Sequence, residues 1–101
     1  MITVDAAVEE FVRLLDVATA IAQEMKNSSR DAFVIQAAEV TIKNLKGFRS
    51  LALSGGLPRP SRGEVALGAG LDLRRGVGEW AGAGKLVEAI GQVEHHYEHS
   101  L

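Results

Sequence analysis

The chain has 101 residues, of which 47% are apolar and 24% are charged. This length supports one hydrophobic core, and this composition is that of a globular domain, which excludes collagen-like and wholly disordered chains. The absence of cysteine excludes disulfides, zinc sites with thiolate ligands and a cysteine nucleophile. No apolar run reaches the ~20 residues of a membrane span, and no secretory leader is recognisable, so we expect a cytoplasmic protein without membrane partners.

Charge is unevenly distributed along the chain. Residues 1–42 carry seven acidic and three basic side chains, and residues 43–85 carry three acidic and eight basic ones. Residues 86–101 carry three acidic side chains and no Lys or Arg. The two ends can neutralise the middle within one fold, or the middle can bind an anion. The net charge of −2 provides no general attraction to nucleic acid, which we therefore do not expect as a partner.

The first expected element is a long helix over about residues 4–26. Its apolar residues recur at alternating steps of four and three, as in a heptad seam: Val4, Val8, Phe11, Leu15, Ala18, Ala22 and Met25. Thr3 is the expected N-cap, and Asp5 falls in the first turn, where the helix dipole favours negative charge. Residues 27–29 (Asn-Ser-Ser) are expected to break the helix.

A second helix is expected to begin near Arg30, with Ser28 as its cap. One heptad stripe consists of Val34, Ala38, Thr41, Leu45, Phe48 and Ala52. Further apolar residues make this helix apolar on more than one side: Phe33, Ile35, Ala37, Val40 and Ile42. Such a helix must be nearly surrounded, by the rest of the chain or by another copy. The short break makes the two helices antiparallel neighbours in a hairpin over residues 3–53.

A glycine- and proline-rich linker over residues 54–61 follows the hairpin. Ser61 and Glu64 match a capping box, which predicts a helix from Arg62 to about Arg75. The alternative is a strand over residues 62–75, because Val65, Leu67, Ala69, Leu71 and Leu73 alternate with small or polar residues. A lone strand has no partner in this sequence, so we prefer the helix.

The last expected helix has one apolar stripe, formed by Leu86, Ile90, Val93, Tyr97 and Leu101. This helix begins either at Lys85 or already at Val77, because glycines lie between these two positions and the sequence does not decide between them. Trp80, which lies among glycines, is interpreted as part of the core rather than as a binding platform. The sequence thus predicts an all-α, single domain over residues 1–101. It consists of a long antiparallel helical hairpin followed by one or two shorter helices in residues 62–101, a three- or four-helix bundle.

Motifs for catalysis and metal binding are weak. The segment from Gly82 to Lys85 resembles the end of a phosphate-binding loop, but Glu79 replaces the first glycine and Leu86 replaces the hydroxyl residue, which excludes a P-loop. What remains is the weaker possibility of an anion held by backbone N–H groups at a helix start. His95 and His99 have the i,i+4 spacing of a metal-binding pair, but the sequence offers no further ligand cluster. We therefore expect no enzyme, no metal and no cofactor.

The first functional hypothesis is a non-enzymatic protein-interaction module, such as an adaptor, an inhibitor or an immunity-type binder, that acts as a homo-oligomer and docks a protein partner. The alternative is a protein that sequesters or senses a small anionic ligand, such as a nucleotide or phosphate. Its candidate ligand-binding residues are the basic residues of the middle segment: Lys43, Lys46, Arg49, Arg59, Arg62, Arg74 and Arg75.

Overall fold

The computed structural model describes residues 5–65, 70–81 and 84–101. These residues form the α-helices α1 (Ala6–Ser28), α2 (Ala32–Ser54), α3 (Leu73–Ala81) and α4 (Lys85–Ser100), with a short 3-10 helix η1 (Pro60–Arg62) between α2 and α3. The described ranges contain no strand. The predicted all-α fold is confirmed, and the described residues form four α-helices in a bundle.

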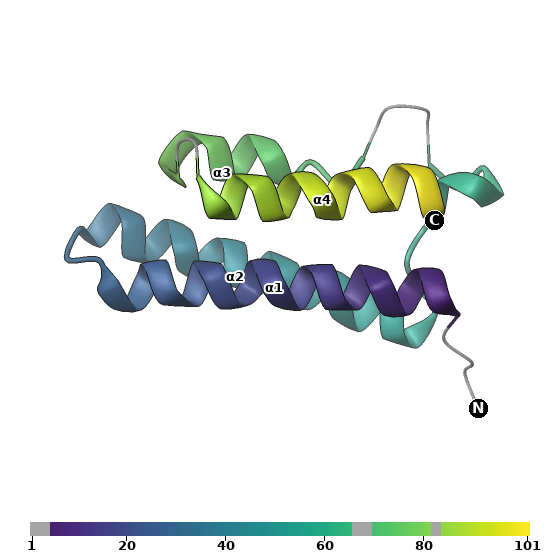
Figure 1. The fold of residues 1–101 in the computed structure, drawn as a ribbon, viewed down its shortest axis with the longest axis horizontal. Coiled ribbons are helices and arrows are strands. Elements are labelled where there is room, and N and C mark those ends of the chain that lie inside the picture. The colour runs from purple at the N-terminus through teal and green to yellow at the C-terminus, as the bar shows by residue number, and fades with distance from the viewer. Residues whose placement is uncertain (1–4, 66–69, 82–83) are drawn as a thin grey trace.

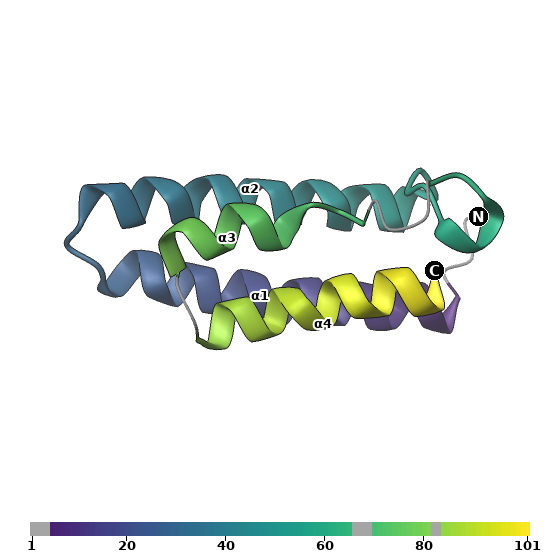
Figure 2. The same ribbon diagram turned by 90° about the horizontal axis from the view of Figure 1, so that it is seen from above.

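The helices lie in two layers (Figure 1). The antiparallel hairpin of α1 and α2 forms one layer, and α3 and α4 lie on it. Seen from above, α4 runs along α1, and α3 runs along the N-terminal half of α2 (Figure 2). η1 and the C-terminus lie at one end of the bundle, together with the start of α1, and the α1–α2 turn lies at the other end.

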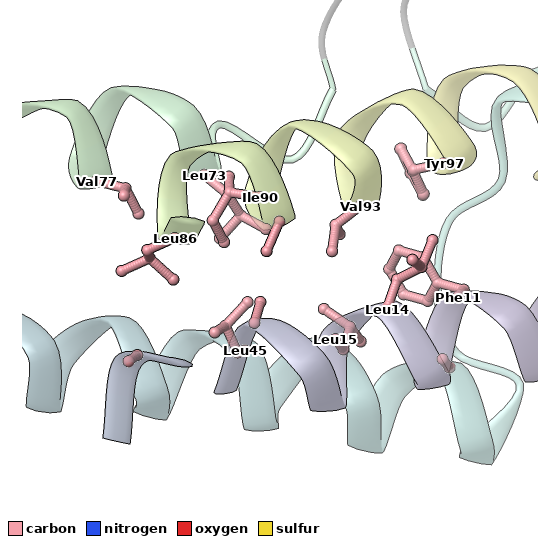
Figure 3. Packing of buried hydrophobic residues seen from close by; sticks show 14 of the residues in the cluster. Phe11, Leu14, Leu15, Leu45, Leu73, Val77, Leu86, Ile90, Val93 and Tyr97 are labelled. Atoms are coloured by element: carbon pink, nitrogen blue, oxygen red, sulfur yellow. The ribbon is translucent and has the colours of Figure 1, made fainter. Parts of the chain in front are cut away.

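The predicted apolar stripes form the core between the layers. Figure 3 shows Phe11, Leu15 and Leu45 of the hairpin facing Ile90 and Val93 of α4. The buried members of α1 include most of the predicted seam, namely Val8, Phe11, Leu15, Ala18 and Ala22. The whole predicted stripe of the last helix is buried as well: Leu86, Ile90, Val93, Tyr97 and Leu101. Burial of these stripes is the main stabilising contribution to the bundle.

The helix starts differ from the prediction. Asp5, rather than Thr3, caps α1, and its Oδ1 accepts the Val8 N–H at 2.9 Å. Asp31, rather than Ser28, caps α2, and its Oδ1 accepts the Phe33 N–H at 2.9 Å. A carboxylate places a full negative charge at the positive end of the helix dipole, which a hydroxyl does not. α4 begins at Lys85, because residues 77–81 belong to α3.

The helix predicted over residues 62–75 is confirmed only at residues 73–75, which begin α3, and is wrong at residues 63–65 and 70–72. The chain turns at Gly63, which has a φ of +70°, and α3 begins only at Leu73 and continues to Ala81. The predicted capping box does not form, because both of its residues bind elsewhere. The Ser61 N–H and hydroxyl donate to the Leu101 carbonyl, and Glu64 Oε1 accepts the Arg59 N–H at 3.2 Å. Residues 66–69 of this prediction lie outside the described residues.

A buried carboxylate of α4 holds the start of α3. Glu94 is only 5% exposed, and its Oε1 accepts the N–H groups of Leu71 and Leu73, both at 3.2 Å. Gly70 makes room for this contact, since a Cβ there would lie 2.8 Å from Glu94 Oε2. Gly70 also has a φ of +56°, a conformation that glycine adopts without steric strain. These contacts hold the backbone just before and at the start of α3.

The linker between the layers is fastened at the end of the bundle where the chain starts and finishes. The Tyr97 hydroxyl donates to the Pro58 carbonyl, and Arg59 Nη1 lies 2.9 Å from Asp5 Oδ2. The Val8 N–H and the Arg59 guanidinium lower the pKa of Asp5. Burial raises the pKa of Tyr97 above its ordinary value of 10.0, with a smaller contribution from the negative charge of Glu64.

Replacing Glu94 tests its role. We expect Glu94→Ala to lower the free energy of unfolding by about 2–4 kcal/mol, because two N–H groups lose their acceptor in a buried place. Glu94→Gln keeps an uncharged acceptor and should cost less. The measurement is urea denaturation, with Glu88→Ala, an exposed position on the same helix, as the matched control. Equal losses for Glu94→Ala and Glu88→Ala would contradict this role.

Stability should also fall at alkaline pH because of Tyr97. A group whose pKa is raised in the folded state stabilises the fold fully below its unfolded pKa, and this contribution is lost as the pH rises through the folded pKa. The unfolded value is near 10.0, so the loss begins above it. Tyr97→Phe should cost about 0.5–1.5 kcal/mol at neutral pH by removing one hydrogen bond. The difference in free energy of unfolding between wild type and Tyr97→Phe should then become smaller above pH ~10. Urea denaturation at several pH values measures it. A difference that stays constant would contradict the assignment.

Candidate functional site

The most exposed apolar side chains of the described residues concentrate on α2. A row of α2 residues at steps of four and three is named here the outer row: Phe33, Ala37, Val40, Asn44, Gly47 and Leu51. Its large apolar members are exposed, Phe33 by 62%, Val40 by 55% and Leu51 by 42%. The buried stripe of α2 lies one position further along the chain, so the outer row is the neighbouring face of the same helix.

Two hollows border the outer row. The helix hollow, of about 310 Å³, lies between α2 and α3, where Phe33 and Val40 face Val77 and Trp80. The loop hollow, of about 680 Å³, lies further along α2, where Gly47 and Leu51 meet residues 71–73. The two hollows share Asn44, Asp72 and Leu73 as lining residues. They therefore form one continuous depression, named here the α2 groove.

Two glycines in helices line the α2 groove, and no neighbouring atom among the described residues requires a glycine at either position. Gly47 lies in α2 and Gly76 lies in α3, and a Cβ at either position would meet no atom within 4 Å. Glycine in a helix interior destabilises it by about 1 kcal/mol relative to alanine. No contact within the described chain offsets this cost at these positions, whereas an approaching helix would gain room there.

Charge differs between the two halves of α2. The N-terminal half of α2 carries Glu39 and is preceded by its N-cap Asp31, and the second half carries Lys43 and Lys46. All four side chains are exposed. Glu39 lies 3.4 Å from Lys26 of α1. Lys43 and Lys46 form no ion pair with the described residues. The exposed surface of α2 therefore changes from acidic to basic along the helix.

The basic residues predicted to bind an anion are placed at different parts of the molecule. Arg49 pairs with Asp16 of α1 at 2.9 Å, and Arg59 pairs with Asp5. Arg74 Nη2 donates to the Gly91 carbonyl at 3.3 Å. Arg59 and Arg62 lie at the end of the bundle with η1, whereas α3, which carries Arg74 and Arg75, lies in the other half (Figure 1). The side chain of Arg75 lies outside the described residues.

The structure therefore does not gather those of these side chains that it describes around one hollow. Lys43 borders the loop hollow, and Lys46 follows it along the exposed side of α2. Anion binding stays a prediction. Residues 82 and 83 of the glycine-rich segment considered for an anion also lie outside the described residues.

The histidines lie on α4 beside α1. The rings of His95 and His99 have centroids 4.3 Å apart, and His96 Nε2 lies 2.7 Å from the Ala7 carbonyl oxygen. These rings border an open hollow of about 500 Å³ together with Glu10 and Arg13. A hydrogen bond from Arg13 lowers the pKa of Glu10. Across the described ranges, no three potential metal ligands come together.

Trp80 and Glu94 show what sequence reasoning left incomplete. The sequence places Trp80 in the core, and its side chain is half-buried, packs against the core and also lines the helix hollow. Glu94 was not singled out, although it lies four residues after Ile90 and three before Tyr97, on the buried face of α4. A carboxylate on a buried helix face is the signal that could have identified it.

Phe33 should contribute little to the folding of one chain. We expect Phe33→Ala to change the free energy of unfolding by less than about 0.5 kcal/mol, because the ring is exposed. Phe11→Ala, which removes a fully buried ring, should cost about 3–5 kcal/mol. Both variants are measured by urea denaturation in dilute protein, where association contributes least. A loss for Phe33→Ala close to that for Phe11→Ala would show that the ring belongs to the core of one chain.

Comparison with known proteins provides no relative for this chain. No family model, no curated protein and no solved structure matches it. Among the described helices, none combines the length and apolar character needed to cross a bilayer. The α2 groove is therefore interpreted from its own geometry and charge.

Proposed function

We propose that this chain is a non-enzymatic protein-interaction module that acts as a homo-oligomer, with the α2 groove as its docking surface. The observation that carries the proposal is the outer row of α2. Three large apolar side chains, Phe33, Val40 and Leu51, are exposed in register on one helix face beside two hollows. Scattered apolar residues are ordinary on protein surfaces, but aligned ones beside a groove are typical of an interaction site.

The spacing of the outer row favours a helix as the docked element. Alternating steps of three and four keep a row of side chains on one face over several turns, which is the pattern that packs one helix against another. Addition of a peptide as a further β-strand would require a free strand edge, and the described residues contain no strand. An amphipathic helix that enters a groove is a common mode of protein recognition.

The chain itself supplies a suitable helix. Among the helices described, α2 is the one that combines a buried stripe with an exposed row of large apolar residues. A second copy can therefore cover the α2 groove with the same face, as in a twofold interface. The other large apolar residues found exposed, Val17 and Leu53, lie outside the outer row.

The oligomeric state tests this function. We expect native mass spectrometry and light scattering at micromolar concentration to show a mass at least twice the 10.8 kDa of one chain. Phe33→Glu should raise the dissociation constant at least ~100-fold, because the interface would bury an unpaired carboxylate. Val17→Glu, which places the same charge on an exposed apolar position of α1, is the matched control and should leave the mass unchanged.

A wild-type chain that stays monomeric at all accessible concentrations would contradict the proposed function. Equal dissociation by Phe33→Glu and Val17→Glu would contradict the α2 groove as the docking surface. A bound mass of a few hundred daltons per chain in the native spectrum would instead support the anionic-ligand hypothesis.

A further inference from the structure

We propose that α2 packs antiparallel against α2 of a second copy, about a twofold axis between Val40 and Asn44, with Phe33 of each copy closing the loop hollow of the other. This inference rests on the proposed function, because it names the segment of the second copy that enters the α2 groove. In this pairing Phe33 opposes Leu51 of the second copy, which lines the loop hollow.

The outer row can pair with an antiparallel copy of itself so that residues of similar size face each other. Its steps are four, three, four, three and four, which read the same in both directions. When the row is laid antiparallel on itself, the large end residues Phe33 and Leu51 oppose each other. The small residues Ala37 and Gly47 oppose each other in the next layer, and Val40 opposes Asn44 in the central layers. Small residues facing each other let the helix axes approach, while larger ones fill the space on either side. The support for pairing of the row with itself is therefore the match in size of the opposed residues at its ends and in the next layer.

The charges of α2 match the same pairing. Glu39 lies in the acidic half of the helix, exposed and 3.4 Å from Lys26 of α1. Lys43 and Lys46 lie in the basic half, exposed, and these two lysines form no ion pair among the described residues. An antiparallel arrangement brings Glu39 of one copy to the level of Lys43 and Lys46 of the other. A parallel arrangement would bring like charges together along the whole helix and align the two helix dipoles unfavourably.

The short α3 leaves room for the second copy. α3 has nine residues and covers only the N-terminal half of α2 (Figure 2). The loop hollow therefore remains open beside Gly47 and Leu51, at the level that Phe33 of the second copy reaches in this register. Gly47 has open space where a Cβ would project. The exposed Phe33 of one copy thus meets a space that the described residues of the other copy leave unfilled, twice in each dimer.

Cysteine pairing tests the register directly, because the natural chain contains no cysteine. We would mix Val40→Cys with Asn44→Cys protein and oxidise the mixture or bridge it with a short thiol reagent. The expected product is the mixed dimer, formed at least about tenfold faster than either self-pair, since a disulfide requires Cα atoms within about 7 Å. Val17→Cys on α1 is the control for random collision.

A filled glycine tests the close approach. Gly47→Leu should raise the dissociation constant of the dimer at least about tenfold, because the added side chain meets Ala37 of the second copy. The isolated chain should still fold, since a Cβ at Gly47 meets no atom within 4 Å. Gly78→Leu, a change of the same type on α3 at a position with open space, should leave the dissociation constant unchanged. Circular dichroism checks that both variants fold.

The outcomes separate this pairing from the proposed function. A mixed cysteine dimer together with weaker association of Gly47→Leu supports the pairing. A dimer that persists in Gly47→Leu, or in which Val40→Cys pairs fastest with itself, overturns the antiparallel register while leaving homo-oligomerisation intact. A wild-type monomer overturns both.

Discussion

The start of α3, in the second layer of this protein, is held by one buried carboxylate. Glu94 accepts two backbone N–H groups just before and at the start of α3, and Gly70 gives its other oxygen room. If the chain entered α3 elsewhere, Leu73 and Val77 would not face the core, and neither hollow of the α2 groove would have its second wall. A charged group that is costly to bury is thus kept inside because backbone donors satisfy it, and it fixes the geometry of the surface considered for function.

The sequence predicted what local periodicity determines. The hairpin and the last helix follow from apolar stripes with helical spacing, and the buried residues of α1 and α4 are largely those of the stripes. The predicted N-caps differ from the observed ones, Asp5 and Asp31, because each aspartate lies two or three residues from a serine or threonine that can cap a helix equally well. The helix start was predicted at Arg62 instead of Leu73, because Glu94, which binds the backbone at Leu71 and Leu73, lies more than twenty residues away along the chain.

The candidate site could be predicted only in part from the sequence, for a similar reason. An excess of apolar residues on α2 could be counted, but which side stayed uncovered depends on the length and position of α3. The anion hypothesis relied on basic residues that were close in the sequence. In the structure, Arg49 and Arg59 neutralise Asp16 and Asp5, which lie 33 and 54 residues away. Long-range ion pairs of this kind follow from topology and leave no trace in local spacing.

The position of the chain ends has a consequence for connectivity. The start of α1, η1 and Leu101 lie at one end of the bundle, where Arg59 contacts both Asp5 and the Leu101 carbonyl. The helices can therefore be joined in a different order along the chain and still pack in the same way. A short linker from residue 101 to residue 5, with new ends opened in the turn after Ser28, would give a circular permutant with the same helices side by side. In that permutant the α1–α2 connection would be broken, and α1 would be held to the second layer by the core and by the contacts of His96 with the Ala7 carbonyl and of Arg59 with Asp5.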